Sequence, residues 1–441
     1  MPQPLYHITT YGCQMNKNDS ERIASLLRSL GFSATEDESA ADLILVNTCS
    51  VRQSAEDRVF GSQEKYLDYK KTRPNIIVAV TGCMPGRDKA REFRKRLPAT
   101  DLYFPTPEMV HLPKWIAELR PDLVNSESLE QDYLKIRPLR APSVQAYVTI
   151  QTGCNKFCTY CVVPYARGLE RNRPTKDILD ECRELVAHGI KEITLLGQTV
   201  NSFIATDPES FSVQNPYKNH FAALLWEVNQ LEGLERVHWT AAHPVSMHDE
   251  VIDALALPKQ VRYLHLPVQS GSSEVLRRMN RKYTREEYLV CIQKIRMRVP
   301  DLIFGTDIIV GFSGETREQF EETLSLYREV DFAISYNAQY SVRSGTLAPR
   351  LFPDDVAPEE KRDRWDALQE LMKERSLASN TALIGTEQRM LVERIEDGIA
   401  IGTTDALKVC RFPSTDQSLV GSFIPVRVRG AKTWVLDVTK L

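Results

Sequence analysis

The sequence predicts an α/β protein of several domains in which parallel strands alternate with helices. Three observations favour this fold class. The chain has 441 residues, which is long for a single domain. Short runs rich in Val, Ile and Leu alternate with amphipathic helical segments over most of its length. The segment after residue 377 contains only short β-rich runs separated by turns, as in a small β-barrel.

Residues 1–125 form the first predicted domain. Three β-rich runs, at 5–13, 41–51 and 75–85, are separated by helical segments, which predicts a parallel sheet covered by helices. The following segment, about 120–143, is polar and contains proline, as linkers do.

Residues 144–370 form the second predicted domain, a series of six βα units. Right-handed crossovers would curl such a sheet toward a barrel, and six strands are fewer than the eight of a closed one. We therefore expect an open, partial (β/α)6 barrel. Its strands are expected at 146–153, 192–201, 235–244, 263–271, 303–312 and 333–341. Residues 377–441 are expected to form the third domain, a β-barrel of five short strands.

Three cysteines lie close together at Cys154, Cys158 and Cys161. Iron–sulfur cubanes usually take four cysteine ligands, so three leave one iron open for a substrate or cofactor. A structural zinc site is the alternative, and it would need a fourth Cys or His nearby. None occurs at short spacing, because the next Cys or His after Cys161 is Cys182 and the one after that is His188. The spacing therefore favours an open iron–sulfur cluster.

Each predicted strand of the first domain ends in a cysteine, at Cys13, Cys49 and Cys83. One such residue alone would be read as a buried thiol. In open α/β sheets, however, ligands bind beyond the carboxyl ends of the strands, so three cysteines in equivalent places would meet at one edge. The sequence predicts a second three-cysteine metal site there. The remaining cysteines, Cys182, Cys291 and Cys410, are expected in the core.

The composition is that of an ordinary globular protein, with 42% hydrophobic residues and a formal net charge of −3. RNA would therefore have to bind through local patches. The N-terminus shows no signal-peptide pattern, and no apolar run approaches a membrane span. Nine cysteines, an odd number, favour metal ligands over disulfides. We expect a cytoplasmic protein without membrane contact.

The cysteine motif, with Tyr160 before its last cysteine, resembles the radical S-adenosylmethionine superfamily signature. A closer resemblance covers nearly the whole chain. Its segments resemble, in order, those of the methylthiotransferase family, with the first two most similar to the MiaB-type branch: TYGCQMNKNDSE, LVNTCSVR, VTGCMP, GCNKFCTYCVVPYARG, LLGQTVNSF, YLHLPVQSGSSEVLRRMNRKY and TDIIVGFSGET.

The resemblance implies a radical barrel between an N-terminal domain with an auxiliary cluster and a C-terminal TRAM barrel. It implies two [4Fe-4S] clusters and S-adenosylmethionine. The radical cluster would be held by Cys154, Cys158 and Cys161, and the auxiliary, sulfur-delivering cluster by Cys13, Cys49 and Cys83. The implied reaction adds a methylthio group to C2 of N6-isopentenyladenosine beside the tRNA anticodon. A one-electron donor such as flavodoxin or ferredoxin, a sulfur source and a monomeric state are also implied.

Strand-end position and the resemblance together suggest residues that bind S-adenosylmethionine: Tyr160, Gly197, Gln198, Gln269 and Ser270. Basic residues suggest contacts with RNA phosphates. They are Arg167, Arg171 and Arg173 after the motif, and Arg277, Arg278, Arg281, Lys282, Arg285, Lys294, Arg296 and Arg298. The third domain has Ile401-Gly402-Thr403 where a TRAM domain is expected to have a glycine–arginine pair, so it need not contact RNA.

Two alternatives remain open. The first keeps the chemistry and changes the substrate to threonylcarbamoyladenosine in tRNA or an aspartate in a ribosomal protein. The second is a non-catalytic iron–sulfur RNA-binding sensor, against which the two triads argue because sensing needs no cofactor site.

Overall fold

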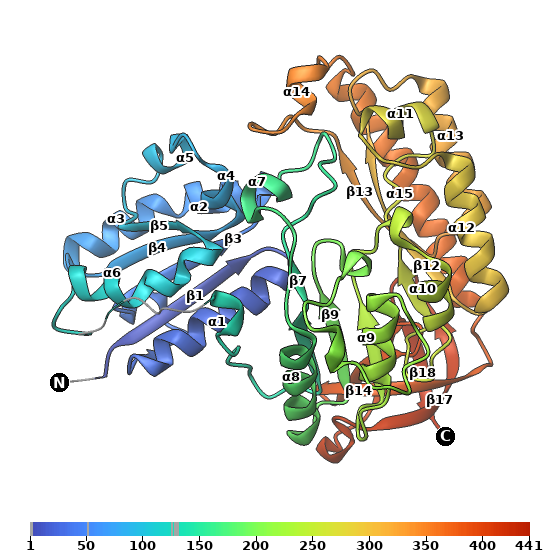
Figure 1. Cartoon of the computed structure of the whole chain (residues 1–441), viewed down its shortest axis with the longest axis horizontal. Coiled ribbons are helices and arrows are strands. Elements are labelled where there is room, and N and C mark those ends of the chain that lie inside the picture. Colours follow the sequence, from blue (N-terminus) through green and yellow to red (C-terminus); the bar gives the residue numbers. More distant parts are fainter. Residues whose placement is uncertain (1–2, 51–52, 125–126, 128–131) are drawn as a thin grey trace. The chain divides into compact units, whose positions relative to one another are not determined.

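The computed structural model describes residues 3–50, 53–124, 127 and 132–441 (Figure 1). Part of the predicted linker, at 125–126 and 128–131, lies outside the described residues, as does the end of the NTCSVR segment. The chain forms two compact units, and the loop after the first strand of the barrel contributes to both of them. The first unit comprises 1–141, 152–157 and 161–171, and the second comprises 142–151, 158–160 and 172–441.

A five-stranded parallel sheet is the framework of the first unit, in the order β2-β1-β3-β4-β5. Alternate residues of its central strands feed two cores: Leu43 and Leu45 pack with α1 and α6, whereas Ile44 and Val46 pack with α2 and α3. Burial on both faces explains why these strands are continuous apolar runs. The strands are β1 (Leu5–Tyr11), β2 (Ser33–Ala34), β3 (Leu43–Thr48), β4 (Ile77–Gly82) and β5 (Leu102–Pro105).

Helices cover both faces of this sheet, so the predicted parallel α/β arrangement is confirmed. The helices of this unit are α1 (Gln14–Ser29), α2 (Gln53–Gly61), α3 (Gln63–Thr72), α4 (Cys83–Arg87), α5 (Glu92–Lys95), α6 (Leu112–Leu119) and α7 (Val163–Arg167), the last of which packs on α4, with 3-10 turns at Glu38–Ala40, Thr106–His111 and Tyr133–Lys135.

Six parallel strands form the barrel of the second unit, in two groups ordered β10-β9-β6 and β11-β12-β13. Between the groups, Val237 of β10 exchanges backbone hydrogen bonds with Lys259 (2.7 Å) and Val261 (3.1 Å). The predicted open barrel is therefore confirmed. Its strands are β6 (Gln145–Thr149), β9 (Glu192–Leu196), β10 (Arg236–Trp239), β11 (Tyr263–His265), β12 (Ile303–Val310) and β13 (Ile334–Gln339).

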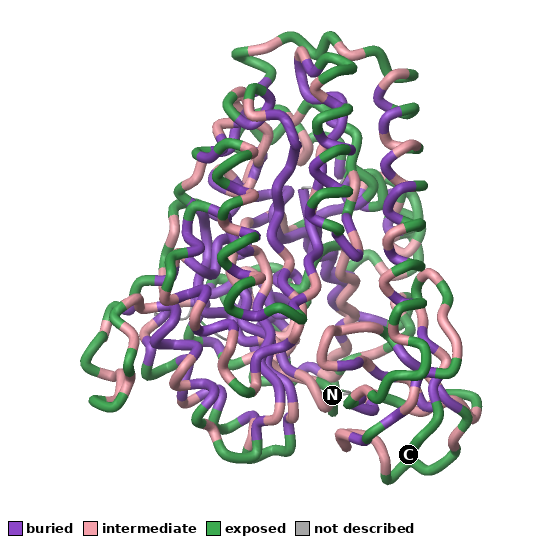
Figure 2. Tube along the Cα trace, turned by 90° about the vertical axis from the view of Figure 1, so that its right-hand side faces the viewer, coloured by how far each residue is buried: buried purple, intermediate pink, exposed green. Residues whose placement is uncertain are grey.

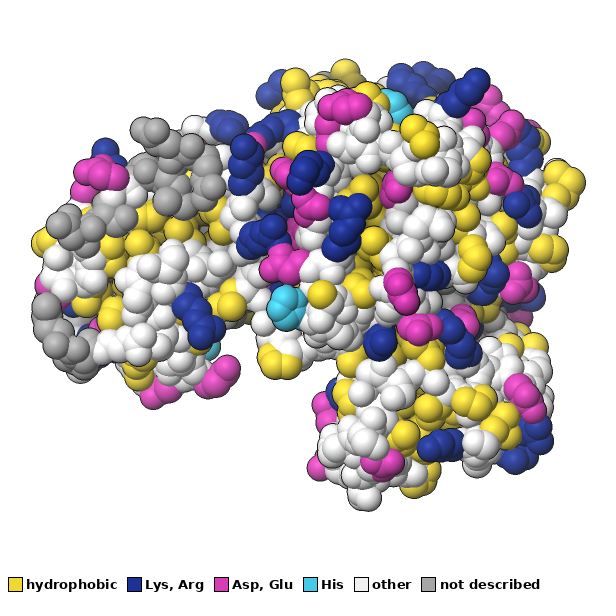
Figure 3. Space-filling view, turned by 60° about the horizontal axis from the view of Figure 1, so that its bottom comes forward, with side chains coloured by type: hydrophobic (Ala, Val, Ile, Leu, Met, Phe, Trp, Pro, Cys, Tyr) yellow, Lys and Arg dark blue, Asp and Glu magenta, His cyan; other side chains and the backbone are white. Residues whose placement is uncertain are grey.

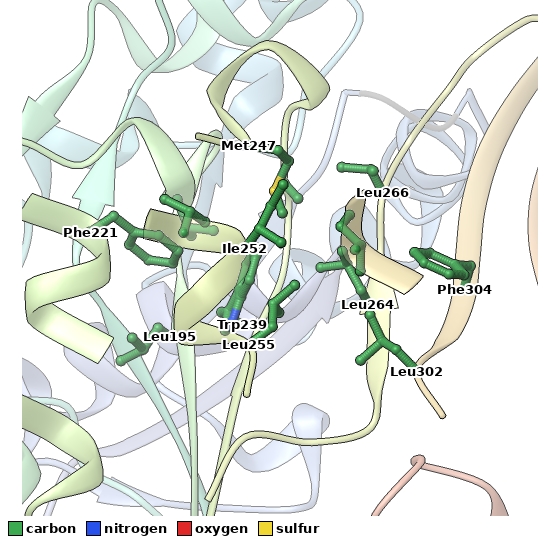
Figure 4. Packing of buried hydrophobic residues seen from close by; sticks show 14 of the residues in the cluster. Leu195, Phe221, Trp239, Met247, Ile252, Leu255, Leu264, Leu266, Leu302 and Phe304 are labelled. Carbon is green, nitrogen blue, oxygen red and sulfur yellow. The ribbon is translucent and has the colours of Figure 1, made fainter. Parts of the chain in front are cut away.

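The barrel strands and the helices outside them enclose one large apolar core. Figure 2 shows buried segments in the interior of the trace and exposed residues mainly on its outer coils and loops. Figure 4 shows part of the core, where Phe221 lies edge-on to Trp239 with ring centroids 5.1 Å apart. The helices are α8 (Thr175–Ala187), α9 (His220–Asn229), α10 (Asp249–Ala254), α11 (Ser273–Arg278), α12 (Arg285–Arg298), α13 (Arg317–Val330), α14 (Ala348–Leu351) and α15 (Pro358–Thr381). Shorter elements are β7 (Gln151–Thr152), β8 (Arg171–Asn172), and 3-10 turns at Val200–Ser202, Pro208–Ser210 and Pro244–Ser246.

The C-terminal segment closes into a separate five-stranded barrel within the second unit, as predicted. Arg236 of β10 joins it to the larger barrel: its guanidinium pairs with Glu192 and donates hydrogen bonds to Thr404 O (2.8 Å) and Thr403 Oγ1 (2.7 Å). The strands are β14 (Glu387–Glu396), β15 (Ile399–Thr404), β16 (Val409–Pro413), β17 (Phe423–Ala431) and β18 (Leu436–Lys440), with a 3-10 turn at Gln417–Leu419. No helix among the described residues is long and apolar enough to cross a membrane.

Candidate functional site

The three strand-end cysteines of the first unit follow neighbouring parallel strands at one edge of the sheet. The register aligns Tyr11 with Thr48 and Thr48 with Gly82. Cys49 and Cys83 come directly after their strands and are buried, and Cys13 follows β1 by two residues and is exposed. This edge, at the carboxyl ends of the strands, is where the sequence predicted a site.

Two buried asparagines fix the start of α1, where Cys13 is the N-cap, against the end of β3. Asn16 Nδ2 donates a hydrogen bond to Asn47 Oδ1 (3.0 Å), and Asn47 Nδ2 donates one to the Asn16 carbonyl oxygen (2.9 Å). The Cys13 thiol donates to Asn16 Oδ1 over 3.4 Å. Both asparagines lie within the segments TYGCQMNKNDSE and LVNTCSVR, but their role at this edge was not predicted from the sequence.

Gly82 has a backbone conformation that only glycine adopts readily, with φ of 105°. A Cβ atom there would lie 2.3 Å from the Thr48 carbonyl oxygen, so a side chain would push β4 away from β3 where Cys49 and Cys83 begin their turns. Glycine is therefore required for this edge to form.

A buried ion pair lies beside these cysteines within the same unit. Arg167 Nη2 is 2.7 Å from Asp19 Oδ2, and each side chain is at most 4% exposed. Burial raises the pKa of Cys83, and the positive charge of Arg167 opposes that shift. The helix of Arg167 lies directly on α4: a Cβ atom at Gly86 would come within 2.1 Å of the Ala166 carbonyl oxygen.

The loop cysteines are divided between the units: Cys154 and Cys161 belong to the first and Cys158 to the second. In the first unit, the Cys154 amide donates to the Gly168 carbonyl (3.1 Å), and Cys154 Sγ accepts from the Lys156 amide (3.5 Å). A Cβ atom at Gly153 (φ 77°) would lie 2.0 Å from the Leu169 carbonyl oxygen. Close backbone contacts therefore set the position of Cys154.

In the second unit, Cys158 is buried next to Arg281. Arg281 Nη1 donates to Cys158 Sγ (3.4 Å), Nη2 donates to the Pro267 carbonyl (3.0 Å) and Nε donates to Tyr283 Oη (2.9 Å). Thr159 is bonded to the turn after α11 through the Met279 and Arg278 carbonyls, each over 3.0 Å. Arg281 was expected to contact RNA phosphates, and its burial excludes that role.

Most of the other basic residues expected at RNA are occupied within the protein. Arg167 and Arg173 are buried in ion pairs, the latter with Glu181, and Arg171 pairs with Asp132. In the 271–298 run, only Lys282 has no such partner among the described residues. The others bond to Glu274, Gln319, Glu329, Asp249, Asp253 or backbone carbonyls. Figure 3 likewise shows Lys and Arg interspersed with Asp and Glu on the visible face.

The residues suggested for S-adenosylmethionine lie in the second unit with differing exposure. Half-buried Tyr160 packs against the apolar cluster of Val275, Phe312 and Tyr340. Gly197 and Gln198 follow β9 and are half-buried. Gln269 has a positive φ of 73° and bonds through its backbone to Asp307 (2.9 Å) and Ile309 (3.0 Å). Ser270 is fully buried, and its hydroxyl accepts from the Ser272 amide (3.2 Å).

The thiol groups at both places suit an iron–sulfur cluster. Among the described residues, no three His, Cys, Asp or Glu side chains form a group that could hold a single metal ion. In a cluster each cysteine binds a different iron, so the cysteine sulfurs are farther apart than the ligands of one ion.

One observation favours a negatively charged group at the strand-end site. Arg167 Nη1 is buried and has no hydrogen-bond partner among the described residues.

Family models match two parts of the chain. The radical SAM superfamily model matches residues 148–327, which include the loop cysteines, five of the six barrel strands (β6 from Val148, β9, β10, β11 and β12) and the helices between them. The sixth strand, β13, lies beyond the match. The model of an uncharacterized protein family, UPF0004, matches residues 5–105, which include the parallel sheet and its strand-end cysteines.

Solved structures share the fold at low sequence identity. The radical S-adenosylmethionine methyltransferase TsrM from Kitasatospora setae, with cobalamin and a [4Fe-4S] cluster bound, has a TM-score of 0.54 at 14% identity, covering 90% of this chain and 80% of TsrM. The cobalamin-dependent radical enzyme OxsB, with S-adenosylmethionine bound, has a TM-score of 0.52 at 13% identity, covering 85% of this chain and 56% of OxsB.

Curated relatives match over their whole length. A tRNA-2-methylthio-N6-dimethylallyladenosine synthase of Clostridium botulinum (strain Okra / Type B1) is 40% identical over 440 residues, covering 98% of this chain and 96% of the relative. The synthase of Carboxydothermus hydrogenoformans is 40% identical over 448 residues, covering 99% of both chains. The chain therefore belongs to the tRNA-2-methylthio-N6-dimethylallyladenosine synthase family of radical S-adenosylmethionine enzymes.

Proposed function

We propose that this protein adds a methylthio group to C2 of N6-isopentenyladenosine next to the tRNA anticodon. The observation that carries the proposal is the presence of two separate cysteine triads, one following the strands of the α/β sheet and one in the loop of the barrel. Full-length similarity to synthases of this kind supports the choice of substrate.

On this proposal, Cys154, Cys158 and Cys161 hold a [4Fe-4S] cluster with one open iron, and Cys13, Cys49 and Cys83 hold the auxiliary one. When bound, these groups and S-adenosylmethionine supply a 5′-deoxyadenosyl radical, a methyl group and the inserted sulfur. The chain positions them and shields part of each triad from water, since Cys49, Cys83, Cys154 and Cys158 are each at most 8% exposed. Cys13 is exposed and Cys161 is half-buried, so each triad has one cysteine nearer the surface.

The hydrogen bond from Arg281 to Cys158 fixes the position of that sulfur beside a buried guanidinium. Tyr160, Gly197, Gln198 and Gln269 are proposed to contact S-adenosylmethionine. Ser270, next to Gln269 in the chain, is proposed to belong to the same site, where its buried hydroxyl accepts a hydrogen bond from the Ser272 amide. The enzyme is proposed to act as a cytoplasmic monomer on the anticodon stem-loop, with a flavodoxin or ferredoxin as electron donor and a separate sulfur source.

Mass spectrometry of tRNA nucleosides tests the substrate. Cells lacking the protein should lose 2-methylthio-N6-isopentenyladenosine and accumulate N6-isopentenyladenosine. An unchanged level would overturn the proposal. Loss of the methylthio group from threonylcarbamoyladenosine, or from a ribosomal protein aspartate, would assign one of the alternative substrates instead.

Two triple variants test whether one triad is needed for cleavage of S-adenosylmethionine and the other for methylthiolation. With Cys154, Cys158 and Cys161 all replaced by Ala, the reconstituted protein should form neither 5′-deoxyadenosine nor product. With Cys13, Cys49 and Cys83 replaced by Ala, it should still cleave S-adenosylmethionine but lose methylthiolation. If the wild-type protein forms no 5′-deoxyadenosine on reduction, the non-catalytic sensor is the better description.

A further inference from the structure

Arg167 is a buried cation that is not among the residues proposed to bind a cluster or S-adenosylmethionine. Its side chain is 4% exposed, and that of Asp19, its ion-pair partner, is 2% exposed. Taking both charges out of water is costly, and an apolar pair of similar volume is often at least as stable. The position therefore calls for a reason beyond stability.

Three helices that belong to the strand-end site meet at this ion pair, all within the first unit. Asp19 lies on α1, which starts immediately after Cys13, and α4 starts at Cys83. Arg167 is the last residue of α7, whose backbone lies against α4 at Gly86 and Ala166. The guanidinium is consequently positioned among the helix starts that carry two of the three cysteines.

The hydrogen bonds of Arg167 are incomplete on one side. Nη2 donates to Asp19 Oδ2 over 2.7 Å, but Nη1 has no hydrogen-bond partner among the described residues. A buried donor without an acceptor costs free energy, and the cost is larger when the donor is charged. Besides Asp19, the groups that attract this cation are Cys83, Tyr133 and Cys13. Two of these are cysteines of the strand-end site.

A second buried pair shows what a purely structural arrangement looks like. Arg364, in the second unit, donates from Nη1 to the carbonyl and carboxylate of Glu315 (3.0 and 2.8 Å) and from Nε to Glu360 (2.7 Å). Among the described residues, no nitrogen of this guanidinium is both shielded from solvent and without a hydrogen-bond partner. The open Nη1 of Arg167 is the difference.

We propose that Arg167 is a positioning residue of the auxiliary cluster: it supplies a positive charge and a free N–H group to the Cys83 side of the cluster, and Asp19 holds it there. This inference rests on the proposed function, because it takes the strand-end cysteines as the auxiliary ligands. Reduction adds negative charge to a cluster, so a nearby buried cation stabilises the reduced form. Arg167 thus raises the reduction potential, whereas Asp19 lowers it.

The test uses the full chain carrying Cys154→Ala, Cys158→Ala and Cys161→Ala, in which only the strand-end triad can bind a cluster. After anaerobic reconstitution, iron and sulfide are counted and the midpoint potential is measured by redox titration followed by electron paramagnetic resonance. Arg167→Met should make reduction about tenfold less favourable, which is about 60 mV for a one-electron couple. Arg167→Lys should recover most of this shift.

The variant Asp19→Asn distinguishes an effect of the Arg167 charge from a structural effect of the substitution. If Arg167 acts by its charge, Asp19→Asn shifts the potential in the positive direction, opposite to Arg167→Met, and the double variant lies near the parent. The double variant also removes both buried charges, so it keeps the test usable if Arg167→Met folds poorly. Arg364→Met should lower stability without moving the potential.

The outcomes separate the two proposals. Equal potentials in all variants, or shifts of the same sign in Arg167→Met and Asp19→Asn, overturn the role of Arg167 while leaving the auxiliary cluster in place. A parent protein that binds no iron overturns the auxiliary site itself and, with it, this inference.

Discussion

The two cysteine triads are built in different ways. The strand-end triad spans residues 13–83 and depends on the register that aligns β1, β3 and β4. The loop triad spans 154–161 and depends on local contacts such as those of Gly153 and Cys154. The first site is therefore a consequence of the sheet topology, and the second is a consequence of one loop. A mutation that disturbs one of the two sites should therefore leave the other intact.

Gly82→Ala is expected to have the largest effect. The residue has φ of 105°, and its new Cβ would lie 2.3 Å from the Thr48 carbonyl oxygen. A conformation open only to glycine costs about 3 kcal/mol for another residue. Denaturant unfolding should show this loss, and iron analysis should show that the strand-end cluster is lost while the loop cluster stays.

Gly61 offers the matched control for Gly82, since it lies in the same unit with no atom within 4 Å of a new Cβ. Gly61→Ala should leave both clusters and the unfolding free energy unchanged. Retention of the strand-end iron in Gly82→Ala would show that this site does not depend on the β3–β4 register.

Gly153→Ala is the reciprocal change in the loop. Its φ is 77°, and the new Cβ would lie 2.0 Å from the Leu169 carbonyl oxygen. A left-handed conformation costs a residue with a side chain roughly 1–2 kcal/mol before the clash is counted. We expect loss of 5′-deoxyadenosine formation with the strand-end iron retained. Loss of both clusters together would mean that the two sites are not independent.

The sequence predicted those parts of the molecule that local patterns encode. Apolar runs between turn residues placed the strands at Leu43–Thr48 and Ile77–Gly82, and the cysteines that follow them marked the edge. Parallel topology then explains why residues so far apart in the chain meet. The open barrel was predictable for the same reason, because its six strands alternate with helices.

Contacts between distant residues were not predictable in this way. Arg167 and Asp19 are 148 positions apart, and Arg281 and Cys158 are 123 apart. A cluster of Lys and Arg in a sequence does not reveal which carboxylates and carbonyls will face it after folding. For this reason the predicted RNA-contacting residues turned out to be mostly occupied, and Asn16 and Asn47 went unnoticed.

Arg281→Met should weaken the loop site with a smaller effect than either glycine change. It removes the hydrogen bonds from the guanidinium to Cys158 Sγ, the Pro267 carbonyl and Tyr283 Oη, although the Pro267 carbonyl keeps its bond from Tyr283 Oη (3.3 Å). We expect about 2 kcal/mol of lost stability and a lower reduction potential of the loop cluster. Redox titration of the chain lacking the strand-end cysteines measures that potential. An unchanged reduction potential would show that Arg281 has only a structural role.

The C-terminal barrel has neither triad and should respond to pH without affecting them. Burial lowers the pKa of Lys408 to about 8 against the attraction of Asp331, and its Nζ donates to Ser379 Oγ over 3.0 Å. The unfolded chain holds this proton up to the ordinary lysine pKa of 10.5. Between these values the unfolded state binds more protons, so stability rises with pH across this window. Lys408→Met should add about 1 kcal/mol at pH 7 and flatten that rise in denaturant unfolding, whereas exposed Lys440→Met should not. If Lys408→Met also removed iron from either triad, the barrel would not be independent of the cluster sites.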